Sequence, residues 1–196
     1  TGERFKRGGF QQPKALIPVD GKPIIFWLLD EFCKNNEESL SQLKCICVPY
    51  IDEYEVEAFE TEITQRYSAI NFFFVPLGKP TRGAAETVLI GLSELKKELN
   101  GLDSPVLCID SDNFYTCEML KCWGGRNCVF SFFDERPEPI FSYVDIDANN
   151  RILQIKEKVK ISNFANCGAY GFESMQTLHQ NCTEVIARDL RDKNEF

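Results

Sequence analysis

Histidine and long apolar runs are scarce in this sequence. Its 196 residues hold one histidine, His179, and no clear catalytic histidine or cysteine motif. No apolar run approaches the ~20 residues that a membrane helix needs, and neither a signal peptide nor an internal repeat is visible. We therefore expect a cytoplasmic protein without a membrane partner.

Positive charge is also in short supply. The formal net charge is -8, whereas nucleic-acid binding requires a basic face that neutralises phosphates. This balance argues against a nucleic-acid partner. It is compatible with a small phosphorylated ligand held by a local basic cluster, and it leaves oligomerisation open.

The nine cysteines do not form the pattern of a disulfide framework. Their number is odd, and Cys45, Cys47 and Cys108 lie inside apolar runs, where cysteine behaves as a small core residue. Paired C-x-x-C spacing is missing, which argues against a structural zinc site. We expect reduced thiols.

Strand-like and helix-like segments alternate along the first half of the chain. Helical spacing occurs at 22–35, 52–67, 82–99 and 183–193, and strand-like runs occur at 43–50, 71–76, 105–113, 127–133, 140–147, 151–158 and 166–172. Such alternation predicts an α/β fold of the Rossmann-like type. We expect a mixed, mainly parallel sheet flanked by helices, with an antiparallel hairpin part in the later strands.

The whole chain, residues 1–196, is expected to form a single catalytic domain. A doubly wound sheet normally opens with a strand that feeds a glycine loop, and this sequence opens on the loop. We therefore expect a first strand ahead of Thr1 and a C-terminal continuation in the full protein.

The opening stretch, TGERFKRGGFQQPKALIPVDGKP, combines glycines with cations. Gly2 and its neighbours allow close backbone approach, and Arg4 and Lys14 are among the cations that could meet a triphosphate. The stretch is not a G-x-x-x-x-G-K-[ST] P-loop. A solvated basic loop is the alternative interpretation.

A second motif, VLCIDSDNFY, delivers Asp110 and Asp112 at the carboxyl end of an apolar strand, where open α/β sheets bind ligands. Residues two apart on an extended chain point the same way. Two such carboxylates suit Mg²⁺, which prefers oxygen ligands. The alternative is that one acid caps the next helix and the other is solvated.

Two further stretches carry weaker signals. Gly83, Ala84 and Ala85 leave room for a flat group at a helix start, although a tight turn would have the same composition. Near the end of a later strand, Glu157 and Lys158 could meet hydroxyl or phosphate groups, or form a solvated edge.

Together, these four stretches resemble one family, the sugar-phosphate nucleotidyltransferases (nucleotide-sugar pyrophosphorylases), which have a GT-A-like fold of the nucleotide-diphospho-sugar transferase type. The opening is similar to the second half of the family signature G-x-G-x-R-[FL]…PK-x-L-[IV]-P-V-x-G-K-P. The matching residues are Gly2, Arg4, Phe5, Pro13, Lys14, Leu16, Pro18, Val19 and Pro23.

The other three stretches follow in the family's order. RGAAETVL is similar to the base-reading loop G-T-A-x-A, with Ala84 in place of threonine. IDSDNF is similar to the metal motif G-D-N. IKEKVKISNFANCGAYGF is similar to E-K-P…N-x-G-x-Y-x-F, with Val159 in place of proline.

The resemblance implies a Mg²⁺-dependent enzyme that transfers NMP from an NTP to a sugar-1-phosphate or similar phosphomonoester and releases pyrophosphate. It implies catalytic roles for Arg4, Lys14 and Asp112, and a metal role for Asp112 first and Asp110 second. Gly2, Gly83, Ala84 and Ala85 would bind the nucleotide, and the acceptor would contact Glu157, Lys158, Asn166 and Gly168.

Two other functions remain open on the sequence. The spacing of Asp110 and Asp112 also matches the D-x-D metal motif of a GT-A glycosyltransferase that consumes a nucleotide sugar. A non-catalytic subunit that keeps the nucleotide pocket is the third interpretation.

Overall fold

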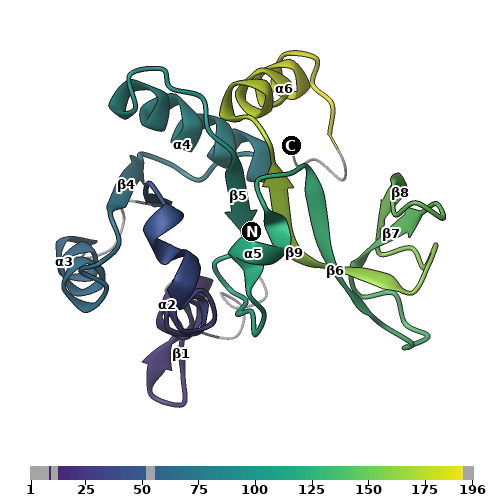
Figure 1. The fold of residues 1–196 in the computed structure, drawn as a ribbon, viewed down its shortest axis with the longest axis horizontal. Helices are drawn as coiled ribbons and strands as arrows, with labels where there is room; N and C mark the ends of the chain where they lie inside the picture. Colours follow the sequence, from purple (N-terminus) through teal and green to yellow (C-terminus); the bar gives the residue numbers. More distant parts are fainter. Residues whose placement is uncertain (1–8, 10–12, 52–55, 192–196) are drawn as a thin grey trace.

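Helices lie on both sides of the central strands in the computed structural model, and the later strands extend away from them (Figure 1). The structure describes residues 9, 13–51 and 56–191. The α-helices are α2 (Ile24–Asn35), α3 (Val56–Arg66), α4 (Ala84–Glu98), α5 (Met119–Trp123) and α6 (Met175–Ala187), and 3-10 turns occur at η1 (Lys14–Leu16) and η2 (Glu37–Gln42). The strands are β1 (Pro18–Val19), β2 (Lys22–Pro23), β3 (Ile46–Ile51), β4 (Phe72–Leu77), β5 (Val106–Ile109), β6 (Cys128–Phe133), β7 (Ser142–Ile146), β8 (Ile152–Glu157) and β9 (Phe164–Phe172).

The described strands form two two-stranded sheets and one larger antiparallel sheet. β1 and β2 pair antiparallel. β3 and β4 pair in parallel. The larger sheet has the order β5-β9-β7-β8, and β6 pairs with β9. The mixed α/β class is confirmed, and its antiparallel share is larger than expected because β9 runs opposite to both β5 and β6.

Within the described residues, β3 and β5 are not hydrogen-bonded to each other, so each has one partner strand. Two expectations stay predictions: a first strand ahead of Thr1, and a single domain formed by residues 1–196.

Side chains of β3, β4 and β5 alternate between two apolar clusters, as the two-residue period of a strand requires. Ile46, Phe72 and Leu107 pack toward the cluster that holds α2 and α3. Cys47, Phe73 and Cys108 pack toward the cluster of α4 and α6. Both faces of these strands are therefore apolar, which explains their continuous apolar sequence.

The final helix differs from its prediction. α6 covers Met175–Ala187 rather than 183–193. Its start is fixed by Ser174, whose side chain accepts a hydrogen bond from the Thr177 backbone N–H at 3.0 Å. Met175, Leu178 and Cys182 then bury one face of α6 at helical spacing. The short helix α5 was not predicted, and residues 52–55 of the predicted second helix lie outside the described residues.

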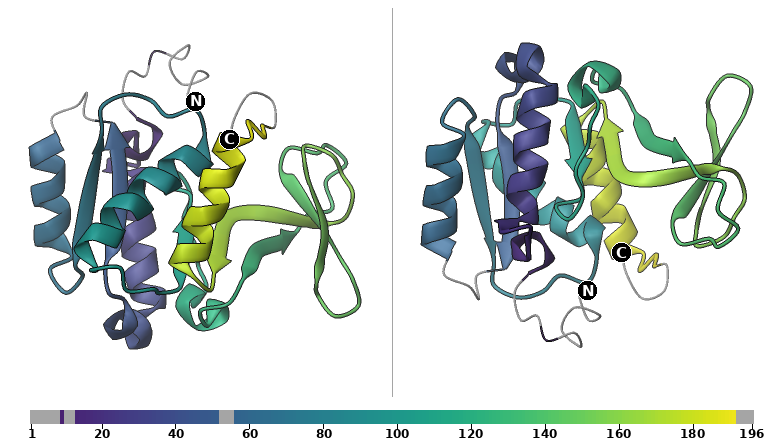
Figure 2. Two further views of the ribbon diagram at one scale, coloured as in Figure 1. Left: turned by 90° about the horizontal axis from the view of Figure 1, so that it is seen from above. Right: turned by 90° about the horizontal axis from the view of Figure 1, so that it is seen from below.

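Strands β7 and β8, with the adjoining ends of β6 and β9, project away from the helices (Figure 2). We call this part, residues 131–166, the arm, and the rest of the described chain the body. Asp134 stabilises the arm internally because its carboxylate accepts hydrogen bonds from Tyr143 and Arg136, both within the arm, each at 2.7 Å. Hydrogen bonds from Arg136 and Tyr143 hold the pKa of Asp134 well below its usual range.

None of the helices in the described part of the chain combines the length and the apolar character needed to span a bilayer.

Helices α2 and α3 are joined by a polar cluster around Asp30. Its carboxylate accepts hydrogen bonds from Lys22 at 2.8 Å, Arg66 at 2.8 Å and Tyr67 at 2.7 Å. Partial burial would raise the pKa of Asp30, but hydrogen bonds from Lys22, Tyr67 and Arg66 outweigh it and lower the pKa to about 2. The ionised carboxylate is therefore favoured in the folded protein.

Replacing this carboxylate should destabilise the fold only where it is ionised. We expect Asp30→Asn to lower the free energy of unfolding at neutral pH by about 1–2 kcal/mol after allowance for solvent screening. Because folding lowers the pKa from 3.8 to about 2, the contribution of Asp30 is complete above pH 3.8 and disappears as the pH falls through that interval. Urea unfolding from pH 7 to pH 3 measures it. Glu184→Gln, which removes an exposed pair with Arg188, is the control. A stability difference independent of pH would contradict this prediction.

Candidate functional site

The site begins with a contact between two residues 98 positions apart. Lys14 Nζ lies 3.1 Å from Asp112 Oδ2. Lys14 opens η1, where the N–H of Leu16 donates to the Pro13 carbonyl at 2.9 Å, and the buried side chain of Ile17 fixes the segment to the body. Asp112 follows β5. The basic opening stretch and the acidic strand end thus meet, as the sequence predicts.

Asp110 lies against β9 at the same strand end. Its N–H donates to the Gly168 carbonyl on β9 at 2.8 Å. Its carboxyl group lies against Gly168 so closely that a Cβ on Gly168 would come 2.1 Å from Asp110 Oδ2. Gly168 also has φ +77°, a conformation that favours glycine. Only glycine therefore allows Asp110 to keep this position.

The electrostatics of the two carboxylates favour a cation. Burial and, to a smaller extent, the Asp112 carboxylate raise the pKa of Asp110 to about 6, although Lys14 acts to lower it. A divalent cation would relieve this repulsion. Mg²⁺ is typically held by one or two carboxylates plus substrate phosphates, so this oxygen donor set fits it. No group of three or more candidate metal ligands occurs among the residues that the structure describes.

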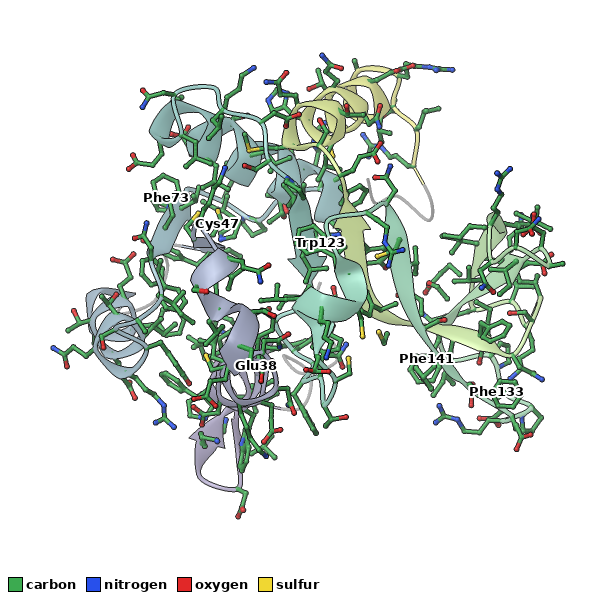
Figure 3. All side chains as sticks on the ribbon, in the orientation of Figure 1. Glu38, Cys47, Phe73, Trp123, Phe133 and Phe141 are labelled. Carbon is green, nitrogen blue, oxygen red and sulfur yellow. The ribbon has the colours of Figure 1, made fainter. Side chains whose placement is uncertain are left out.

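A cavity of about 470 Å³ opens beside Asp110, between the body and the arm. Five of its eleven lining residues are aromatic and come from the loop after β5, from the arm and from β9: Phe114, Tyr115, Phe132, Phe141 and Tyr170. Figure 3 shows Phe141 where the arm joins the body, with Phe133 farther out. The cavity therefore lies next to the carboxylates and takes one wall from the arm.

Asn166 and Gly168 form the β9 side of this cavity. The Asn166 side-chain oxygen accepts from the Gly168 N–H at 2.8 Å, and its amide nitrogen donates to the Tyr170 hydroxyl at 2.6 Å. Tyr115 donates to the Gly168 carbonyl at 3.0 Å. These bonds hold the left-handed backbone at Gly168.

Glu157 and Lys158 lie behind the arm's wall of the cavity. Ser142, which lines the cavity, donates a short hydrogen bond to Glu157. Lys158 Nζ lies 3.1 Å from Glu157, and the Lys158 N–H donates to the Phe141 carbonyl. Glu157 and Lys158 therefore do not line the cavity themselves; they contact Ser142 and Phe141, which do.

The predicted nucleotide residues occupy a different place. Gly83 precedes α4, and Ala84 and Ala85 form its first turn. A hollow of about 370 Å³ lies between the end of β4 and this turn, with Thr81 and Glu86 in its lining. Gly2 and Arg4 lie outside the described residues.

Sequence reasoning missed the aromatic lining. Phe132 and Phe141 were interpreted only as strand residues, and Phe114 only as part of the acidic motif. The sequence signal for an aromatic wall is the position of Phe114 and Tyr115 close after Asp110 and Asp112.

The chain matches no protein-family model and no curated protein. Among solved structures, it is similar to the nucleoside-diphosphate-sugar pyrophosphorylase from Vibrio cholerae, with 20% identity over 100% of this chain and 80% of that chain and a TM-score of 0.75. It is also similar to the inositol-1-phosphate CTP transferase from T. maritima (14% identity, 90% and 68% coverage, TM-score 0.64) and to HddC from Yersinia pseudotuberculosis (14%, 87% and 71%, 0.63). These likenesses confirm the expected fold.

A methyl group at Gly168 should disrupt the site. We expect Gly168→Ala to lower the free energy of unfolding by about 2 kcal/mol or more, because it adds strain at positive φ and an overlap with Asp110. Gly78→Ala is the matched control, since its Cβ would meet nothing within 4 Å, and it should change stability by less than about 0.5 kcal/mol. Equal urea midpoints for the two variants would show that the close approach is unimportant.

Proposed function

We propose that this protein transfers a nucleoside monophosphate from an NTP to a sugar-1-phosphate or a similar small phosphomonoester and releases pyrophosphate. The observation that carries the proposal is the contact of Lys14 with Asp112 at 3.1 Å, beside the second carboxylate of Asp110. It stands in a fold shared with a pyrophosphorylase and a CTP transferase.

The reaction needs charge neutralisation more than covalent chemistry. A phosphate oxygen of the acceptor attacks the α-phosphorus, the bond to the β-phosphate bridging oxygen breaks, and pyrophosphate leaves with the electron pair. Lys14 is well suited to the negative charge that develops on the α-phosphate, as we propose also for Arg4.

The proposed metal is Mg²⁺, held by Asp112 and Asp110. When bound, it would supply positive charge to the phosphate oxygens. Without it, the neighbouring carboxylates would repel a triphosphate, so Lys14 alone leaves the site poorly matched to its substrate.

The acceptor would lie in the aromatic cavity. Asn166 and Gly168 line it, while Glu157 and Lys158 support the wall that carries Phe141 and Ser142. The nucleotide base would occupy the hollow at the start of α4, near Gly83, Ala84 and Ala85.

Pyrophosphate release tests the proposal. The full-length protein, with each of the four NTPs, Mg²⁺ and a panel of phosphomonoesters, should release pyrophosphate, and EDTA should abolish the release until Mg²⁺ is restored. Folded protein that is silent with every combination would refute the function. Transfer from a UDP- or GDP-sugar without pyrophosphate would instead favour the glycosyltransferase that the Asp110–Asp112 spacing also permits.

Two substitutions test the roles of the paired side chains. We expect Lys14→Met and Asp112→Asn each to reduce kcat/KM for pyrophosphate release by about 100-fold or more. Because both side chains are over one-third exposed, the change in unfolding free energy should stay within about 1 kcal/mol. Lys34→Met is the control, since Lys34 is an exposed lysine paired with Glu31 on α2. Wild-type turnover in Lys14→Met would contradict its proposed role.

A further inference from the structure

The cavity beside Asp110 has an unusual balance of groups for the acceptor of a nucleotidyl transfer. Five aromatic rings line it, and none of its described lining residues is lysine or arginine. The one charged side chain in that lining is Asp110. The cavity is therefore suited to an uncharged or cationic group rather than to a second anion.

Two of the aromatic side chains form a corner. The ring centroids of Phe132 and Phe141 are 5.1 Å apart, and their planes meet at 84°. Phe132 is 38% exposed and Phe114 is 59% exposed. Rings at right angles present their faces from two directions, which is the arrangement that surrounds a compact cation in an aromatic cage.

One of these rings already contacts a cation. The Arg136 guanidinium carbon lies 4.9 Å from the centroid of Phe141. This contact places a cation of the protein over Phe141, so a ligand cation would use the rest of that ring together with Phe132 and Phe114.

The polar groups of the cavity are engaged by the protein itself. Asn113 donates to the Cys167 carbonyl, and Ser142 donates to Glu157. Asn166 uses its oxygen for Gly168 and its nitrogen for Tyr170. A ring rich in hydroxyl groups needs many matched partners, and unmatched polar groups weaken binding. With these bonds in place, the lining keeps part of its hydrogen-bonding capacity for a sugar ring, while its aromatic rings are available to a cation.

We propose that the cavity binds an organic cation, so that the acceptor is a phosphomonoester with a quaternary ammonium group at its other end. The inference rests on the proposed nucleotidyl transfer and names the acceptor class of that same site. The methylated ammonium lies among Phe114, Phe132 and Phe141, with the carboxylates nearby, while the acceptor's phosphate points toward Lys14.

This acceptor changes none of the chemistry of transfer. A phosphate oxygen of the acceptor dianion forms the new bond to the α-phosphorus, and the bond from that phosphorus to the bridging oxygen breaks. Pyrophosphate takes the electron pair, and the ammonium group takes no part in the bond changes. No oxidant or reductant is needed.

A pair of isosteric probes tests the cation. Phosphocholine carries the quaternary ammonium, and 3,3-dimethylbutyl phosphate has the same shape with carbon in place of nitrogen. We expect titration calorimetry with the full-length protein and Mg²⁺ to give at least about tenfold tighter binding of phosphocholine. Pyrophosphate release with each NTP should favour phosphocholine over the isostere and over glucose-1-phosphate.

Ring substitutions locate the effect. Phe141→Leu and Phe132→Leu should each weaken phosphocholine binding about tenfold and leave binding of the isostere within about twofold. Phe133→Leu is the matched control on the same strand, because Phe133 is 61% exposed and is not part of the lining. It should bind phosphocholine as the wild type does.

The outcomes separate this inference from the proposed function. Turnover of glucose-1-phosphate without binding or turnover of phosphocholine would overturn the cation site and leave nucleotidyl transfer intact. Equal binding of the two isosteres would also overturn it. Selective, ring-dependent binding of phosphocholine without pyrophosphate release from any NTP would support the cation site and refute the transfer reaction.

Discussion

Strand β9 connects the body to the arm: β6 pairs with both of its halves, whereas on its other side the two halves have different partners. Residues 169–172 pair with β5 in the body, and Ala165 pairs with Tyr143 of β7 in the arm. Gly168 lies between the two halves with a left-handed backbone. The change of direction in β9 therefore occurs against Asp110, and the cavity forms where the strand passes from the body to the arm.

The contact with Gly168 holds the Asp110 carboxylate at the end of β5. Removing a carboxylate from water is costly unless other groups compensate. Near Asp110 the compensation is incomplete: Lys14 contacts Asp112, and burial still raises the pKa of Asp110. A strained electrostatic arrangement of this kind, beside a cavity, is typical of a functional site rather than of a stabilising one. The Asp30 cluster shows the contrast, since its hydrogen bonds outweigh burial.

The family resemblance predicted a joint role for Lys14 and Asp112, and it carried no corresponding prediction for the aromatic lining. The structure brings Lys14 and Asp112 into contact, and their catalytic roles stay predictions. Phe132 and Phe141 could not be assigned in this way. Their contribution depends on the register of β6 with β9 and on how the arm folds back, and one residue of register shift reverses a strand's faces.

The elements of the fold also differed in how well the sequence predicted them. Strands β3, β4 and β5 have continuous apolar residues because they face a cluster on each side, and their sequence signal was strong. Helix α6 was placed too late because its start depends on Ser174, a single capping residue, and on a buried face that begins at Met175. Such local caps carry little weight in a periodicity argument, although they decide where a helix starts.

Because the cavity takes residues from both the body and the arm, substitutions can change its two sides separately. Lys14, Asp110 and Asp112 belong to the body, whereas Phe132, Phe141 and Asp134 belong to the arm. Substitutions on the arm therefore alter the shape and polarity of one cavity wall without touching the charged groups. The proposed nucleotidyl transfer depends mainly on positioning and charge, so the charged groups of the body would carry that chemistry and the wall of the arm would select the acceptor.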